Sequence, residues 1–415
     1  MNQSGARKKR ILFIETARNV GGSVTNVLYP MVMDLDRERY EPLLLFYWPN
    51  PYRERFESEG IPTIVFEKAR SWKHPAPIAR LQKNKAVENI QKNKSKRSVL
   101  YHALGSYVQI GYFAPQIWEL TKLIKAHKVD LVHLNKDPAM YGRAIVLAAK
   151  LARRPVVCYA QNFSEFQAAD RQLARFVDQY VHCSNAIGKH CMAQGGSVPQ
   201  KACTIYPGVV DVEKWSRPYD TSLMRREFGL SDEDFVVGNI GRLTPWKGQD
   251  VFLKALAEVK REAPDVKGLI VGGPTDSPFY KELLALTESL NLADNVYYTG
   301  FRDDIPQVLA SVDVLAHSSC KPEPFATAAI EGMMAGRPVI VTNAGGMPEM
   351  VQHGVTGLLA DINDPGAMAE AILFYYRDQD RAQRIAKAGQ KRATTELSAQ
   401  RHIDEFEALY QRLLV

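Results

Sequence analysis

The sequence predicts an α/β protein with two doubly wound, Rossmann-like domains that face each other across a cleft. Three observations carry this prediction. The chain of 415 residues is too long for one ordinary hydrophobic core. Short β-rich runs recur without polar alternation, as expected for strands buried on both faces of a parallel sheet. Between them lie stretches with apolar residues three and four positions apart, which indicate helices.

Six apolar runs belong to a predicted N-terminal domain at 1–206, and six more to a predicted C-terminal domain at 207–395. The runs lie at 11–15, 42–48, 62–66, 130–134, 155–160, 180–184, 235–240, 268–271, 295–299, 312–317, 338–342 and 357–359. The join falls at Tyr206-Pro207-Gly208, which interrupts the alternation. Open α/β sheets bind ligands beyond the carboxyl ends of their strands, so a cleft between the domains is the expected binding site.

The last predicted helix, at 396–415, has an apolar stripe along one side. Its members are Ile403, Phe406, Leu409, Tyr410 and Leu413. Such a stripe must be covered, so we expect this helix to pack back toward the N-terminal domain.

Composition excludes several classes of protein. An apolar content of 46% is typical of a globular chain and argues against disorder. Five cysteines without CxxC spacing argue against a disulfide framework or a structural zinc, and favour a reducing compartment. No apolar run of about 18 residues indicates a membrane span. The apolar run near the N-terminus is too short for a signal peptide, so a cytoplasmic protein is expected.

Positive charge is concentrated in one segment. Residues 68–97 contain ten Lys or Arg and one acid, whereas the net charge of the whole chain is +7. Aromatic residues follow, and we treat about 68–113 as an insertion in the N-terminal domain. Basic residues beside an amphipathic aromatic stretch favour contact with an anionic membrane surface. A solvated insertion is the equal alternative, and no recognition motif supports nucleic acid.

The densest chemical signal follows the predicted strand 312–317. Pro324 is placed where the first turn of a helix is expected. The amides of Phe325, Ala326 and Thr327 would then point out of the helix N-terminus, which is suited to phosphate oxygens.

Two carboxylates flank this predicted helix start. Glu323 lies at its mouth, and Glu331 lies about two turns further in, where it could accept both hydroxyls of a ribose. A capped helix with two exposed acids is the alternative, with about equal weight.

A second signal follows the predicted strand that ends at Ile240. Gly241 allows close backbone approach, and Arg242 and Lys247 supply two cations. This combination favours a diphosphate. Solvated loop charges are the alternative. The front loop with Gly21-Gly22 is weaker, because two glycines could simply make a turn.

In this order and spacing, the motifs resemble glycosyltransferase family 4, which has the two-domain GT-B fold. The resemblance covers nearly the whole chain, and Glu323 and Glu331 match the family's E-x7-E motif. Its other parts are the Gly21-Gly22 loop, Ser184-Asn185-Ala186, Gly241-Arg242, Lys247-Gly248, Gly300-Phe301 and Ala344 to Glu349.

The resemblance implies transfer of a sugar from a nucleotide-diphosphate sugar, with retention and without a metal or other cofactor. Arg242 and Lys247 would neutralise the leaving diphosphate, and Glu331 would hold the ribose. Glu323 would stabilise the transferred sugar, and the base would lie near Phe301. The remaining donor contacts would come from Gly22, Gly241, Phe325, Ala326 and Thr327.

In the N-terminal domain, which binds the acceptor in this family, His133 matches the first His of an Asp-h-h-His-h-His stretch and Asn135 replaces the second. A catalytic role for His133 is one expectation, but the replacement at 135 argues against it, and a lone histidine at a strand end is more often structural. The basic segment suggests a lipid-linked or other membrane-bound glycan as acceptor. Two other functions remain open: a sucrose- or trehalose-type synthase or phosphorylase, and a non-catalytic protein that binds sugar nucleotides.

Overall fold

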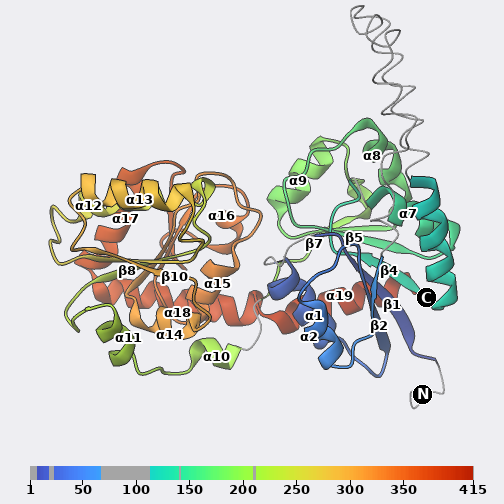
Figure 1. The fold of residues 1–415 in the computed structure, drawn as a ribbon, viewed down its shortest axis with the longest axis horizontal. Coiled ribbons are helices and arrows are strands. Elements are labelled where there is room, and N and C mark those ends of the chain that lie inside the picture. The colour runs from blue at the N-terminus through green and yellow to red at the C-terminus, as the bar shows by residue number, and fades with distance from the viewer. Residues whose placement is uncertain (1–6, 18–22, 67–112, 140–141, 209–211, 415) are drawn as a thin grey trace, which may run out of the picture. The chain divides into compact units, whose positions relative to one another are not determined.

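The computed structural model describes residues 7–17, 23–66, 113–139, 142–208 and 212–414 (Figure 1). Contacts divide the chain into two units. Unit 1 comprises Met1–Cys183, Gly188–Ile205 and Glu405–Val415, and unit 2 comprises Ser184–Ile187 and Tyr206–Asp404. Gly22 and the basic segment 68–97 lie outside the described residues.

Unit 1 is built on a parallel sheet of seven strands in the order β3-β2-β1-β4-β5-β6-β7. The strands are β1 (Lys9–Glu15), β2 (Tyr40–Phe46), β3 (Thr63–Val65), β4 (Leu131–Leu134), β5 (Val156–Ala160), β6 (Gln179–His182) and β7 (Ala202–Thr204). The strand order reverses between β1 and β4, so the sheet is doubly wound. Residues Ile11 to Ile14 of β1 are fully buried, which explains why the strand is apolar on both faces.

Helices of unit 1 connect these strands. They are a π-helical turn η1 (Ser23–Leu28), α1 (Tyr29–Met33), α2 (Arg53–Ser58), a helical stretch at 113–126, α7 (Gly142–Leu151), α8 (Ala168–Leu173), the 3-10 turns η2 (Ala174–Phe176) and η3 (Pro199–Lys201), and α9 (Asn185–Ala193), which belongs to unit 1 from Gly188 onward.

Unit 2 has a parallel sheet of six strands in the order β10-β9-β8-β11-β12-β13. The strands are β8 (Val236–Ile240), β9 (Lys267–Val271), β10 (Val296–Gly300), β11 (Val314–His317), β12 (Val339–Thr342) and β13 (Leu358–Ala360). The order reverses between β8 and β11, which are neighbours. A second doubly wound domain follows, and the carboxyl ends of β8 and β11 meet at its switch point.

Helices cover both faces of the unit 2 sheet (Figure 1). They are α10 (Val212–Ser216), α11 (Ser222–Glu227), the 3-10 turn η4 (Pro245–Lys247), α12 (Gln249–Val259), α13 (Pro278–Ser289), α14 (Ile305–Ser311), α15 (Thr327–Met334), α16 (Met347–Met350), α17 (Pro365–Arg377) and α18 (Gln379–Glu396). The apolar residues of α12 and α17 share one core cluster, and those of α11 and α14 share another.

All twelve predicted strands occur, so the predicted fold class of two parallel α/β domains is confirmed. One strand, β7, was not predicted. It has only three residues, all partly exposed at the sheet edge, and so lacks the long apolar run by which buried strands are recognised.

The last helix is α19 (Ala399–Leu413), close to its predicted position. Its residues from Glu405 onward belong to unit 1, where Phe406, Leu409 and Tyr410 are buried. The backbone N–H of Asp36 donates to the Glu407 carboxylate at 2.7 Å. The C-terminal half of α19 is therefore part of the unit 1 core.

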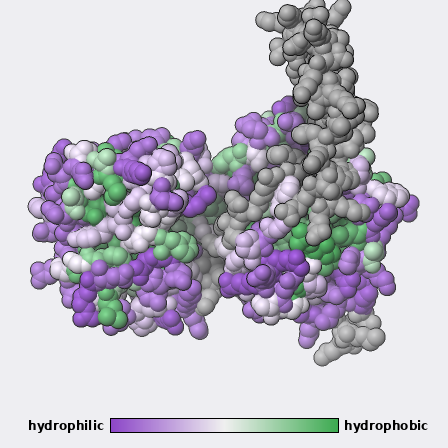
Figure 2. Space-filling model, viewed as in Figure 1, coloured by the Kyte–Doolittle hydropathy of each residue, from purple (hydrophilic) through white to green (hydrophobic). Residues whose placement is uncertain are grey.

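Within the described part of the chain, none of the helices combines the length and apolarity needed to cross a membrane. On the face drawn in Figure 2, hydrophilic residues predominate over both units, with apolar patches scattered among them.

Candidate functional site

The carboxyl ends of the unit 2 strands are joined by backbone hydrogen bonds. The N–H of Leu243, after β8, donates to the Gly273 carbonyl at 2.8 Å, and the N–H of Gly272 donates to the Gly300 carbonyl at 2.9 Å. Gly272 has φ +146°, and a Cβ there would lie 1.9 Å from the Gly241 carbonyl oxygen. Only glycine permits this approach, so the three loops form one continuous backbone edge.

Glu323 is the central side chain of this edge. It is 4% exposed and follows β11. Its carboxylate lies 2.6 Å from the Lys247 Nζ and 3.0 Å from the His317 Nε2, and it also accepts a hydrogen bond from the Ser319 hydroxyl. A buried carboxylate is thus surrounded by donors from two strand ends, as buried charges require.

The same contacts set the charge of Glu323. Burial acts to raise the pKa of its carboxyl, but the neighbouring His317 and Lys247 outweigh burial. The net result is a pKa well below the usual range for glutamate. Glu323 is therefore a carboxylate at neutral pH.

Lys247 is positioned by a tight turn. Besides its contact with Glu323, the Lys247 ammonium lies 4.5 Å from the centre of the Trp246 ring. Gly248 follows with φ +68°, and a Cβ there would lie 2.0 Å from the Ser318 carbonyl oxygen. The turn can rest on the end of β11 only because residue 248 is glycine.

Arg242 differs from Lys247 in its surroundings. It follows β8 by two residues and is exposed, and its guanidinium makes no ion pair within the described residues. Its backbone carbonyl accepts a hydrogen bond from the Gln249 side chain at 3.0 Å. The loop is thus anchored while the cation remains available to an anion.

The helix after Glu323 begins later than predicted. Helix α15 begins at Thr327 with Ala326 as its N-cap, so Pro324 and Phe325 precede it. The reason is tertiary: Glu323 forms a parallel bridge with Gly345, which keeps this segment extended. The phosphate-facing amides predicted at 325–327 therefore move to the start of α15, where no side chain caps the helix. The Phe325 ring stacks on Tyr206, with centroids 5.3 Å apart.

Glu331 lies just over one turn inside α15, not two. It is partly exposed, but dense packing around the carboxyl raises its pKa to about 7, against the opposing effect of Lys214. Burial penalises the charged form of an acid, so this carboxyl titrates near neutral pH.

Phe301 follows β10 and is 85% exposed. The next residue, Arg302, is held by Asp304 at 2.7 Å and by Glu227 at 2.6 Å. The base-binding loop predicted around Phe301 is therefore an anchored loop with one unburied aromatic ring, which can stack on a planar group.

His133 does not fit the predicted catalytic role. It is 0% exposed on β4, and its Nδ1 lies 2.6 Å from the Tyr410 hydroxyl oxygen. The rings of Phe13 and Phe406 lie 5.2 Å and 5.3 Å from it. Because these neighbours bury it completely, no substrate reaches this imidazole. The structure gives His133 a packing role in place of the predicted catalytic one.

The sequence reasoning missed His317 and Ser319 as partners of Glu323. The sequence offered one signal for this role of His317: it ends the predicted strand 312–317, shortly before the E-x7-E motif. In unit 1 it also missed Glu15 and Gln161, which hydrogen-bond to Asn135 at neighbouring strand ends.

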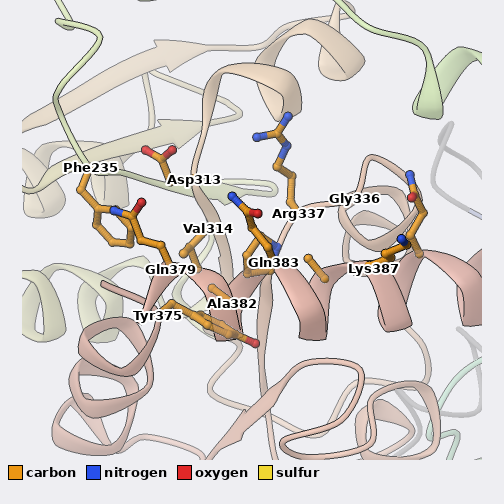
Figure 3. A pocket seen from close by; sticks show the side chains of 13 residues that line it. Phe235, Asp313, Val314, Gly336, Arg337, Tyr375, Gln379, Ala382, Gln383 and Lys387 are labelled. Atoms are coloured by element: carbon orange, nitrogen blue, oxygen red, sulfur yellow. The ribbon is translucent and has the colours of Figure 1, made fainter. Parts of the chain in front are cut away.

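A cavity of about 230 Å³ lies at the other end of the unit 2 sheet (Figure 3). It is formed by residues at the amino ends of the strands, together with residues of α17 and α18. Its labelled side chains with polar atoms are Asp313, Arg337, Tyr375, Gln379, Gln383 and Lys387. Because it opens at the amino ends of β8, β11 and β12, it is separate from the site around Glu323. Among the described residues, no group of three His, Cys, Asp or Glu side chains could hold a metal ion.

Comparisons with known proteins identify the family of this chain. Residues 220–392 match the family described as glycosyl transferases group 1, and residues 53–213 match Glycosyltransferase Family 4. The chain is 28% identical over 268 residues to a D-inositol 3-phosphate glycosyltransferase of Mycobacterium sp. (strain KMS), covering 64% of this chain and 55% of that protein. It is 34% identical to the Segniliparus rotundus protein of the same name, over 52% of this chain and 49% of that one. The chain thus spans about half the length of these curated relatives.

Among solved structures, Anabaena Alr3699/HepE in complex with UDP has a TM-score of 0.78 and 26% identity, with 97% of this chain and 100% of that chain covered. The same protein has also been solved with UDP and glucose. Most of the matched region 53–213 lies in unit 1 and the matched region 220–392 lies in unit 2, and the two parallel sheets have the topology of the GT-B fold. The chain belongs to the group 1 glycosyltransferases of family 4.

Proposed function

We propose that this protein is a retaining glycosyltransferase that uses a UDP-linked hexose as donor. The observation that carries the proposal is the buried carboxylate of Glu323, held between Lys247 and His317 at the switch point of unit 2. The choice of UDP is supported by the Anabaena structures, which contain UDP or UDP-glucose.

Three features of unit 2 suit the diphosphate of such a donor. Arg242 offers an exposed guanidinium, and Lys247 offers an ammonium on the neighbouring turn. The uncapped start of α15 adds backbone N–H groups and the positive end of a helix dipole. These groups would stabilise the negative charge that grows on the leaving phosphate, without requiring a metal.

Glu323 would act on the sugar rather than on the phosphate. When the bond between the anomeric carbon and the phosphate oxygen breaks, positive charge develops on the sugar ring, and a nearby carboxylate stabilises it. The acceptor hydroxyl oxygen then bonds to the anomeric carbon from the side that the phosphate leaves. Its proton passes to the departing phosphate oxygen, so atoms and charge balance and the configuration is retained.

The rest of the donor would be held further along the same edge. Glu331 would accept hydrogen bonds from the ribose hydroxyls, and the exposed ring of Phe301 would stack on uracil. A lipid-linked glycan as acceptor depends on the basic segment 68–97 and stays a prediction. Sedimentation with anionic and neutral liposomes tests it, and equal, negligible binding to both would refute it.

The donor is tested by calorimetry with UDP, GDP and ADP, each with and without EDTA. We expect UDP to bind and EDTA to leave its affinity unchanged. NMR of the product formed from UDP-glucose should then show an α-linkage. An inverted product would refute the retaining mechanism. Binding of GDP or ADP in place of UDP would refute the donor.

A further inference from the structure

Three neighbouring strand ends of unit 1 carry a chain of hydrogen bonds. Glu15 ends β1, Asn135 follows β4 and Gln161 follows β5. These strands are adjacent in the sheet, and its strand order reverses between β1 and β4. Ligands of doubly wound sheets bind outside the carboxyl ends at such a reversal. The chain of hydrogen bonds therefore lies where unit 1 is expected to bind a ligand.

The direction of this chain follows from its inner end. The backbone N–H of Ala17 donates to Glu15 Oε1 at 2.7 Å, and the Asn135 Nδ2 donates to Glu15 Oε2 at 2.7 Å. A carboxylate only accepts, so the Asn135 amide has its NH2 toward Glu15 and its Oδ1 away from it. Gln161 Nε2 donates to that Oδ1 at 2.6 Å. The Gln161 Oε1 is then the outer end, and it is an acceptor.

Burial makes this direction hard to change. Glu15 is 3% exposed and Asn135 is 4% exposed, whereas Gln161 reaches the surface. Turning either amide around would set two donors or two acceptors against each other without water, which is costly in a buried network.

The loop that follows Gln161 is anchored, and a polar group next to Glu15 has no partner among the described residues. In the loop after β5, Ser164 donates to the buried Asp137 carboxylate at 2.5 Å. Next to Glu15, the hydroxyl of Thr16 is buried and has no hydrogen-bond partner in the described part of the chain. A buried hydroxyl without a partner is uncommon and indicates a missing one.

We propose that Glu15, Asn135 and Gln161 form an oriented relay that presents the Gln161 Oε1 to a hydroxyl of a ring polyol or sugar acceptor. Gln161 contacts this hydroxyl, whereas Glu15 and Asn135 are positioning residues that fix which atom of Gln161 faces outward. This inference rests on the proposed glycosyltransferase function and names the chemistry of its acceptor. A hydroxyl donates its proton to the carbonyl oxygen, so a group that lacks a donor at this point is rejected.

The polarity of the relay can be reversed by exchange of its ends. In Gln161→Glu, the new carboxylate faces the Asn135 Oδ1, so two acceptors oppose each other. In the double variant E15Q/Q161E, the amide introduced at position 15 can still accept from the Ala17 N–H while its NH2 donates to Asn135. The Asn135 amide then turns and donates to the carboxylate introduced at position 161, whose second oxygen faces outward as an acceptor. Every hydrogen bond of the relay is restored with the opposite direction.

The test measures binding of glucose and of myo-inositol by ligand-observed NMR with UDP present, on the full chain. We expect Gln161→Glu and Gln161→Leu to weaken polyol binding about 10-fold, the loss of roughly one hydrogen bond. The double variant should return to within about threefold of wild type on the same basis. Gln172→Glu on α8, whose side chain is exposed, serves as a control and should not change binding. Thermal unfolding verifies that each variant is folded. Gln161→Leu removes the hydrogen bond without the negative charge that Gln161→Glu introduces.

The outcomes separate the relay from the proposed function. UDP affinity, measured by calorimetry, should be the same in all variants. If UDP binds but neither polyol does, or if the double variant is as weak as Gln161→Glu, the relay is wrong. If polyols bind and respond as expected but UDP does not bind, the donor proposal fails and the relay stands.

Discussion

Glu323 is the residue on which the proposed chemistry most depends. Its carboxylate is buried between Lys247 and His317 and is ionised at neutral pH. Glu323→Gln keeps the size of the side chain but removes its charge. We expect kcat with UDP-glucose to fall about 10²- to 10³-fold, as when one electrostatic contact to a transition state is lost.

The control for this variant is Glu282→Gln, an exposed glutamate on α13. Both variants should bind UDP with nearly wild-type affinity in calorimetry. Turnover in Glu323→Gln equal to that of the control would contradict the role assigned to Glu323.

Glu331 should make donor binding depend on pH. Its pKa is raised to about 7, so the carboxyl is increasingly protonated as the pH falls below that value. Only the carboxylate accepts hydrogen bonds from both ribose hydroxyls. The affinity for UDP should therefore fall as the pH is lowered through 7, by up to about tenfold per pH unit if only the charged form binds.

Calorimetry with UDP between pH 5.5 and pH 8.5 measures this dependence. Glu331→Gln should bind UDP more weakly, and its affinity should be nearly constant over the same range. The assignment is wrong if wild type and Glu331→Gln show the same pH profile.

At the residue scale, the sequence indicates which loops carry candidate side chains but not how those side chains contact one another. The structure brings Glu323 and Lys247 into contact, and the roles assigned to Glu323, Glu331, Arg242 and Lys247 stay predictions. For His133 the sequence left a catalytic and a structural role open, and its burial under α19, about 270 positions later in the chain, favours the structural one.

At the scale of elements, the turn between η4 and α12 decides where Lys247 lies. Gly248 has φ +68°, and a Cβ there would lie 2.0 Å from the Ser318 carbonyl oxygen. Gly248→Ala must move this turn away from β11. We expect a loss of on the order of 2–3 kcal/mol of folding free energy, from overpacking and from the left-handed backbone together. UDP should also bind more weakly, because Lys247 moves with the turn.

Gly229→Ala is the matched control. Gly229 has φ +65°, but nothing lies within 4 Å of a Cβ built there. It should lose only about 1 kcal/mol, from the backbone conformation alone, and keep its affinity for UDP. Urea unfolding and calorimetry of both variants test this difference. Equal losses in both would mean that contact with β11 does not position the turn.

The strands were more predictable than the helix boundaries. Strands buried on both faces have a continuous apolar signal, whereas the start of α15 depends on a backbone bridge between Glu323 and Gly345. Glu323 and Gly345 are far apart in the sequence, so no local pattern encodes the bridge between them. Strand β7 was missed for a related reason: a half-buried strand of three residues has no periodicity of its own.

At the scale of the whole molecule, unit 1 depends on the end of the chain. Phe406, Leu409 and Tyr410 of α19 are buried in unit 1, and Tyr410 hydrogen-bonds to His133. Truncation after residue 404 would expose this face. At about 1.5–3 kcal/mol for each large side chain, the loss would be several kcal/mol, comparable to the whole stability of many domains.

We expect the truncated protein to show unit 1 as unfolded or aggregated, by circular dichroism and size-exclusion chromatography. Tyr410→Phe retains the ring and should cost only about 1 kcal/mol, the net value of one hydrogen bond. A truncated protein as stable as the full chain would mean that α19 is not part of the unit 1 core.

The sequence by itself determined the two parallel α/β domains and the loops that carry the proposed donor-site charges. These properties are local, since apolar runs, glycine turns and residues just after a strand can be read from short segments. Only the tertiary structure decided that His133 is a core residue, that His317 and Ser319 hold Glu323, and that Glu15, Asn135 and Gln161 are connected. Each of these depends on side chains from separate strands meeting at one sheet edge or under one helix. Such meetings are set by packing over long sequence distances, and spacing along the chain does not encode them.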